Sequence, residues 1–238
     1  MTLLFGMDKF TPLTETVETV AIEETSKESL VKINPSLAVQ IERGWVALLS
    51  YRDIAVNDTL LRVTDISPEL VTVSADIDYR AVVGARYCSA VADTPYQALS
   101  AMAVTITSDK QLVLFIRDSG DWPKSFECVG GFVRARFSCA TVEDFIEARC
   151  ARELAALSIN KTALLGSYQL VSIAEHMFIY RYQVKENAET VRQLYPSAQT
   201  VPLSTVPALL QDTSRLPWPL HAPTAQVLQA LYIAKLLY

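Results

Sequence analysis

Apolar residues recur along the chain at the three- and four-residue spacing of amphipathic helices. The stretch 35–49 shows this stripe. The stretch 141–157 shows it most regularly, and Thr141 followed three residues later by Asp144 is the pattern of a capping box. The other helical segments are expected at 79–87, 189–194 and 223–237.

Between these stretches apolar and polar residues alternate, which is typical of strands. The runs 101–107 and 111–117 flank Ser108-Asp109-Lys110 and predict a hairpin. A second hairpin is expected at 54–63, because Asn57 and Asp58 tolerate the positive φ of a tight turn. Further strands are expected at a sheet edge near 17–22 and at 70–74, 128–133, 163–173 and 177–184. Helices mixed with hairpins in this way predict the α+β class.

The length of 238 residues allows one elaborated domain or two small ones. A second block of strands begins near Ala98. The expected organisation is therefore a strand and helix region over 1–97 and a main domain over 98–238, with the alternative that both pack as one domain.

Composition narrows the class of protein. Half of the residues are hydrophobic, 20% are charged and only seven are glycine, which excludes disordered, collagen-like and disulfide-rich chains. The net charge of −5 and the lack of a basic run give no reason to expect a DNA partner. The four cysteines and two histidines lack zinc-site spacing, so reduced thiols are expected. No signal peptide or membrane span is apparent, and a cytoplasmic location without a membrane partner is expected.

Glu153 is the one misfit on the 141–157 helix. At helical spacing its carboxylate lies on the border of the apolar stripe rather than opposite it. A charge placed there must be paired or bound, because an unpaired buried carboxylate is costly. It either forms an ion pair with Arg149 or Arg152, or acts as a metal ligand beside Gly130 and Gly131.

The same region resembles the Nudix superfamily, whose sequence box follows a strand that ends in two glycines. The segment 121–133, with Gly130-Gly131, looks like that strand, and Arg152-Glu153-Leu154 looks like the Arg-Glu-aliphatic centre of the box. Where the family has its acidic pair, this chain has Ala156 and Leu157. The resemblance implies a Nudix fold, an α/β/α sandwich with a mixed central sheet, here with an N-terminal extension of strands and a helix. It also implies a degenerate box.

A wider likeness points to the branch that hydrolyses UDP-glucose and UDP-galactose. It spans roughly residues 37 to 195, and the segments that carry it occur in the order of that branch: 41–45, 57–62, 79–86, 164–166, 178–182 and 190–195. The implied ligand is a nucleoside diphosphate linked to a sugar, which such enzymes cleave to UMP and a sugar 1-phosphate.

Hydrolysis of this kind needs Mg²⁺ to neutralise diphosphate oxygens and to activate water. Of the family's three carboxylates this chain keeps Glu153, while Glu143 and Glu147 are candidate substitutes as metal ligands, Glu147 also as a catalytic residue, and Glu175 is a further possible donor. Each of these acids could equally be a solvated surface residue. Weak or absent Mg²⁺ binding and reduced or lost hydrolysis are therefore expected. The alternatives are an active hydrolase and a non-catalytic scaffold for protein or RNA.

The resemblance also suggests substrate contacts. Arg80 and Arg86 could clamp a diphosphate or serve as ordinary ion-pair partners, and Arg117 stands where many Nudix proteins place a basic residue toward substrate phosphate. Gly130 and Gly131 are expected to border the ligand. The stripe of the last helix is either a homodimer surface or a core face, and comprises Val227, Leu228, Leu231 and Tyr232.

Overall fold

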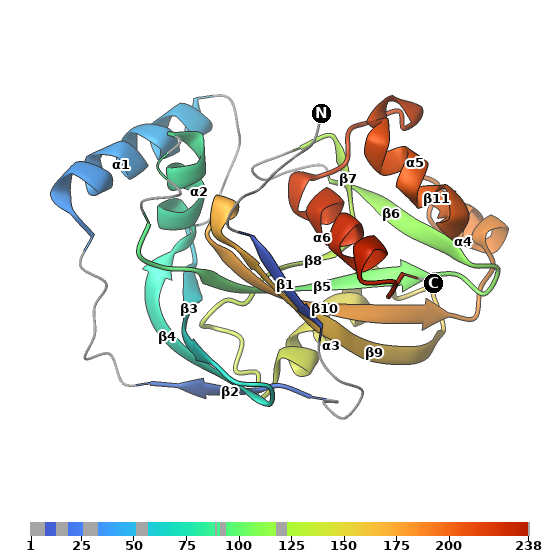
Figure 1. Cartoon of the computed structure of the whole chain (residues 1–238), viewed down its shortest axis with the longest axis horizontal. Helices are drawn as coiled ribbons and strands as arrows, with labels where there is room; N and C mark the ends of the chain where they lie inside the picture. The colour runs from blue at the N-terminus through green and yellow to red at the C-terminus, as the bar shows by residue number, and fades with distance from the viewer. Residues whose placement is uncertain are drawn as a thin grey trace. The chain divides into compact units, whose positions relative to one another are not determined.

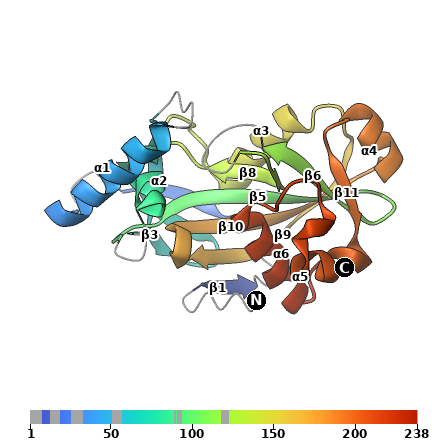
Figure 2. The same ribbon diagram turned by 90° about the horizontal axis from the view of Figure 1, so that it is seen from above.

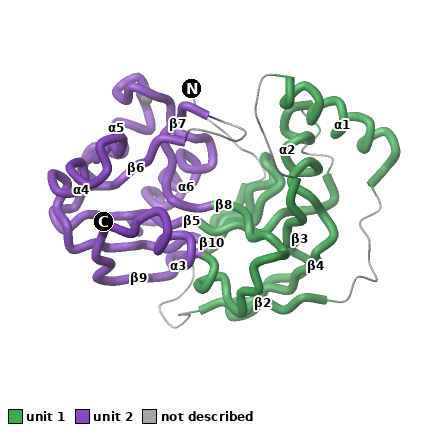
Figure 3. Tube along the Cα trace, turned by 180° about the vertical axis from the view of Figure 1, so that it is seen from behind, with its two compact units in different colours: residues 1–101, 131–145, 167–178 green, residues 102–130, 146–166, 179–238 purple. Residues whose placement is uncertain are grey.

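The computed structural model describes residues 8–12, 19–25, 33–50, 57–88, 90, 94–117 and 123–237. The chain divides into two compact units, shown in two colours in Figure 3. Unit 1 consists of Met1–Ala101, Gly131–Phe145 and Ser167–Phe178, and unit 2 of Met102–Gly130, Ile146–Gly166 and Ile179–Tyr238. Five elements cross a boundary and contribute to both units: β5 (Ala98–Ile106), β8 (Val129–Phe132), α3 (Val142–Glu153), β9 (Ile159–Leu170) and β10 (Glu175–Val184).

Unit 1 holds the N-terminal helices and strands, labelled in Figure 1. These are β1 (Lys9–Pro12), β2 (Ala21–Glu24), α1 (Pro35–Leu49), β3 (Thr59–Ile66), β4 (Leu70–Asp78) and α2 (Tyr79–Tyr87). Unit 1 also holds the short helix η2 (Val171–Ile173). Strand β3 pairs antiparallel with β4, and β2 pairs parallel with β4. The sheet is therefore mixed, as predicted.

Two glycines let α1 and α2 cross at close range, and the two helices lie side by side in Figure 1. A Cβ built on Gly44 would lie 2.0 Å from the carbonyl oxygen of Gly84, and one on Gly84 would lie 2.4 Å from that of Ile41. No side chain fits at either position without moving backbone. Trp45 lies in the apolar cluster beside this crossing and fills core there.

Unit 2 holds the C-terminal elements, which Figure 2 shows from above. These are β6 (Gln111–Arg117), β7 (Ser125–Glu127), α4 (Ala188–Leu194), β11 (Gln199–Pro202), η3 (Leu203–Thr205), α5 (Val206–Gln211), η4 (Thr213–Arg215) and α6 (Ala222–Ile233). Strand β6 pairs antiparallel with β5, β7 and β11. In α6 the side chains of Val227, Leu228 and Leu231 are fully buried within the chain, whereas Tyr232 is exposed. Three of the four stripe residues thus serve the core, and the homodimer stays a prediction.

Most predicted elements are present, with some boundaries moved. The capping box is confirmed, because the N–H of Thr141 donates to the Asp144 carboxylate and the N–H of Asp144 to the Thr141 hydroxyl. The helix expected over 141–157 ends at Glu153 instead. Its apolar stripe continues through a turn, where Leu154 and Leu157 are still buried. The apolar stripe therefore predicted the burial of Leu154 and Leu157 correctly, but the prediction that they belong to the helix was wrong.

The hairpin expected at 54–63 is only partly testable, because its first strand lies outside the described residues. Its second strand belongs to the longer β3, whose hairpin partner is β4. Asn57 serves α2 instead of a tight turn, since its side-chain oxygen accepts the N–H of Arg80. The short elements β1, β7, β11 and α5 were not predicted. The α+β class with a mixed sheet is confirmed, and the boundary expected at residue 97 stays a prediction.

Two general features complete the description. All four cysteines are free in the structure, and their reduced state stays a prediction. Within the described ranges, the helices are too short or too polar to cross a bilayer.

Candidate functional site

Arg86 lies in a buried ion pair of unit 1. Its Nη2 donates to Oε1 of Glu175 at 2.5 Å, and its Nε and Nη2 both donate to the carbonyl oxygen of Ile173. The second carboxylate oxygen accepts the hydroxyl of Ser100 at 2.9 Å. Both charged side chains are at most 6% exposed. These contacts commit Arg86 and Glu175 to each other, so they match the ion-pair interpretation of Arg86 rather than a diphosphate clamp, and Glu175 faces a guanidinium rather than a metal.

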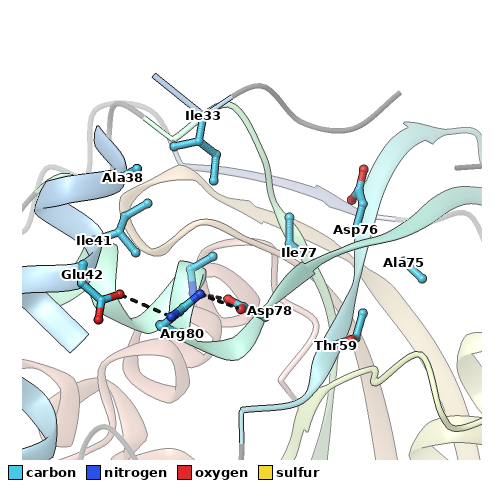
Figure 4. A pocket seen from close by; sticks show the side chains of 11 residues that line it. Ile33, Ala38, Ile41, Glu42, Thr59, Ala75, Asp76, Ile77, Asp78 and Arg80 are labelled. Atoms are coloured by element: carbon cyan, nitrogen blue, oxygen red, sulfur yellow. Dashed lines mark hydrogen bonds and ion pairs between the residues drawn. The ribbon is translucent and has the colours of Figure 1, made fainter. Parts of the chain in front are cut away.

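Arg80 lines a cavity of about 450 Å³ in unit 1, drawn in Figure 4. Its guanidinium lies 3.4 Å from the carboxylate of Glu42 and 3.6 Å from that of Asp78. Asp76 adds a third carboxylate to the wall. Burial opposes the ionisation of Asp76, but the guanidinium of Arg62 at 2.6 Å outweighs it and holds the pKa of Asp76 below its usual range. A wall with three carboxylates and one arginine disfavours a diphosphate.

Arg117 belongs to a group of charged side chains in unit 2. It ends strand β6, opposite Ser125 of β7, and its Nη1 donates to Oε2 of Glu127 at 2.6 Å. The Nδ1 of His221 lies 3.6 Å from the same carboxylate oxygen. Backbone bonds bring His221 there, because its N–H donates to the carbonyl of Phe126 at 2.8 Å. Arg117, which was predicted to face substrate phosphate, thus lies beside the carboxylate of Glu127, and the imidazole of His221 lies near the same carboxylate.

Glu153 joins this group from the last turn of α3. Its Oε1 lies 2.5 Å from Nε of Arg149 in an ion pair and accepts a hydrogen bond from Nη2 of Arg152 at 3.0 Å. The ion-pair interpretation of its sequence position is therefore what the structure shows, with both predicted arginines taking part. We call the group the α3 cluster; its members are Arg117, Glu127, Arg149, Arg152, Glu153 and His221.

Glu127 is an acid of the α3 cluster whose pKa is perturbed. Burial raises its pKa, and the negative charge of Glu153 acts in the same direction, while Arg117 and Arg149 oppose the rise. A carboxyl with a raised pKa is a common feature of functional sites. Sequence analysis missed Glu127 because β7 has only three residues and carries too little pattern to be recognised.

The carboxylates suggested as metal ligands do not assemble. Glu147 is exposed and Glu143 is half-buried on α3. In the part of the chain that the structure describes, no three His, Cys, Asp or Glu side chains lie close enough together to hold a metal ion. The N–H of Ala156 donates to the Tyr195 hydroxyl, and Leu157 is buried. The residues present around Glu153 therefore do not fit a Mg²⁺ site of the Nudix kind, which needs several oxygen ligands.

The double glycine belongs to β8. Gly131 has a φ of 146°, a conformation that residues with a Cβ rarely adopt, so glycine is required there by the backbone. Both glycines are partly exposed. Their contact with a ligand stays a prediction.

Comparison with known proteins gives likeness only at the level of structure. No family model matches the chain, and no curated protein matches it. NrtR of Shewanella oneidensis aligns over 58% of this chain and 64% of its own, with 15% identity and a TM-score of 0.37. NrtR complexed with a 27mer DNA aligns over 58% and 61%, with 14% identity and a TM-score of 0.37. The chain thus spans less than two thirds of either NrtR chain.

Tm1382, classed provisionally as a Nudix hydrolase, aligns over 79% of this chain and 94% of its own, with 11% identity and a TM-score of 0.40. At such identities the likeness concerns the fold alone. With TM-scores below 0.5, it carries no argument about family, ligand or reaction.

Proposed function

We propose that this chain is a Nudix-fold protein that binds a nucleoside diphosphate-linked ligand, such as a UDP-sugar, through the arginines of the α3 cluster, with hydrolysis reduced or lost. The observation that carries the proposal is the pairing of Glu153 with Arg149 and Arg152. A carboxylate held by two guanidinium groups is a poor metal ligand, because a metal ion would have to displace both arginines, one of which also donates a charge-assisted hydrogen bond.

The charges of the cluster support an anionic ligand. Three arginines face two carboxylates, so one positive charge is in excess when His221 is neutral. Guanidinium groups bind phosphate oxygens with two parallel hydrogen bonds. Arginine charge would therefore do here what a metal ion does for diphosphate oxygens elsewhere, but it supplies no activated water.

The protonation of Glu127 should make the proposed binding depend on pH. Its carboxylate holds Arg117 at 2.6 Å, and its raised pKa means that it gives up this charge more easily than an ordinary glutamate. When Glu127 is neutral, the guanidinium of Arg117 becomes available to an anion. Binding should therefore strengthen as the pH falls toward the ordinary pKa range of glutamate.

Calorimetric titration of UDP-glucose in EDTA tests binding without metal. We expect Arg117→Gln to weaken binding about tenfold or more, since hydrogen bonds to charged groups contribute about 1.5–3 kcal/mol. Glu127→Gln should strengthen it, because the neutral amide leaves the charge of Arg117 uncompensated. The matched control is Arg215→Gln, which removes an exposed arginine outside the cluster and should leave binding unchanged. Equal affinity of all four proteins for UDP-glucose would refute binding at the α3 cluster.

Hydrolysis is measured separately, by following UMP release from UDP-glucose with Mg²⁺ or Mn²⁺. We expect little or no product. Rapid release that Glu153→Gln abolishes would instead establish the active hydrolase and remove the claim of lost catalysis. Absence of binding by any nucleotide would favour the scaffold alternative for protein or RNA.

A further inference from the structure

We propose that a second cavity, in unit 2, binds the phosphoryl group of a small organic phosphate. The cavity has a volume of about 480 Å³. This lies within the range of about 300–1,000 Å³ usual for small-molecule sites. Its polar wall carries three cations, Lys110, Lys161 and Arg181, and none of its lining residues belongs to the α3 cluster.

The fold brings these cations together from three separate elements. Lys161 lies on β9 and Arg181 on the neighbouring strand β10. Arg181 and Gln183 are two residues apart on β10 and therefore lie on the same face of the strand. Lys110 sits at the tip of the β5–β6 hairpin with a φ of 60°, and its carbonyl oxygen accepts the N–H of Leu203 at 3.2 Å. The hairpin tip is thereby tied to η3, which forms another part of the wall.

Among the residues that the structure describes, no acidic side chain pairs with the cations of this cavity. Within the described residues, Lys110, Lys161 and Arg181 form no ion pair. The single carboxylate among the lining residues is Asp109, whose oxygens accept the Thr107 hydroxyl, the Gln111 amide and the N–H of Ala188. These hydrogen bonds, the one from Thr107 first, lower the pKa of Asp109, so it stays ionised.

Three positive charges and one negative charge leave two in excess, in a chain whose net charge is −5. A phosphate monoester carries nearly two negative charges at neutral pH and offers three acceptor oxygens. It therefore matches the cavity in charge and in hydrogen bonding, whereas a carboxylate would leave one positive charge over.

The rest of the wall is apolar. Ile106, Leu203 and Leu237 line it, and each is at most 7% exposed in the folded chain. Ser204 and Gln183 add neutral polar groups at the edge. A ligand that fills the site would place its phosphoryl group among the cations and an apolar carbon skeleton against these side chains. Organic phosphate is thus favoured over inorganic phosphate.

The test is calorimetric titration of the full chain with phenyl phosphate, inorganic phosphate and benzoate. We expect phenyl phosphate to bind more tightly than either of the others. Lys161→Gln and Arg181→Gln should each weaken its binding about tenfold or more, as the loss of one charge-assisted hydrogen bond predicts. Lys185→Gln, which removes an exposed lysine just beyond the end of β10 and outside the cavity, is the matched control and should bind as the natural chain does.

Thermal melting without ligand shows whether each variant is folded. Because Lys161 is exposed, Lys161→Glu serves as a second variant that reverses the charge of this side chain. Unchanged phenyl phosphate binding by folded Lys161→Gln and Arg181→Gln proteins would overturn the proposal. So would equal affinity for inorganic phosphate, which would leave an adventitious ion only. Loss of phenyl phosphate binding in Arg117→Gln, with both cavity variants unaffected, would move the anion to the α3 cluster.

Discussion

His176 makes the stability of the fold depend on pH in a defined window. The side chain lies on β10, is 7% exposed and packs beside the ring of Phe178, 5.6 Å away between centroids. Within the described part of the chain its Nε2 has no hydrogen-bond partner. Burial in these surroundings lowers the pKa of His176 to about 4.

The magnitude follows from proton linkage. A histidine in the unfolded chain has a pKa of about 6.5, so between pH 6.5 and pH 4 the unfolded state binds a proton that the folded state does not. A lowered pKa in the folded state means that stability is fully present above the unfolded pKa and is lost as the pH falls. Each pH unit in this window costs about 1.4 kcal/mol, which gives a loss of about 2–3 kcal/mol from pH 7 to pH 4.5.

Urea unfolding at several pH values from 7 to 4.5 measures this loss, with His176→Gln as the comparison. The variant keeps a polar side chain but cannot titrate, so its stability should fall by about 2–3 kcal/mol less than that of the natural chain over the same range. Other groups titrate in both proteins and cancel in the difference. Parallel stability curves for the two proteins would refute the burial argument for His176.

Three further predictions concern stability. Gly84→Ala should lower the free energy of unfolding, measured with urea, by about 1–3 kcal/mol, because the new Cβ would meet a backbone oxygen of α1 at 2.4 Å. This clash exceeds the gain in helix propensity of about 1 kcal/mol. The control Val39→Ala, on the exposed face of α1, should change the free energy of unfolding little. Arg86→Met should lower the free energy of unfolding by about 3–5 kcal/mol, because it leaves Glu175 charged and buried without a partner. The double variant that also carries Glu175→Met should recover much of that stability. A double variant no more stable than Arg86→Met would contradict this reasoning. Glu127→Gln should become more stable relative to the natural chain as the pH rises above about 4.5. The reason is that the pKa of Glu127 is raised in the folded state, so the natural chain loses stability as this carboxyl ionises, whereas glutamine cannot ionise. A difference in melting temperature that does not change with pH would count against this prediction.

The elements recovered from the sequence are those whose signal is local. The capping box of α3 joins residues three apart, and the β5–β6 hairpin joins two alternating runs through a short turn. The pairing of Glu153 with Arg149 follows from helical spacing alone, since residues four apart share one face of a helix. Such contacts depend on a few neighbouring residues, so their pattern can be recognised without the fold.

Strand partners and cavities depend on residues far apart in the chain. Nothing near Asn57 indicates that β3 would pair with β4, or that the Asn57 side chain would help to cap α2. The raised pKa of Glu127 results from burial beside charges that come from β6 and α3. Burial and long-range approach are properties of the packed chain, so no sequence window contains them.

The sequence by itself determined the α+β class, most helices and strands, and the charge types available along α3. Only the tertiary structure decided what those charges face: Arg86 meets Glu175, Arg117 meets Glu127, and three cations from a hairpin and two strands surround one cavity. The physical reason is that helix and turn preferences act over a few residues, whereas electrostatic environment is set by whichever distant side chains the packing brings within a few ångströms.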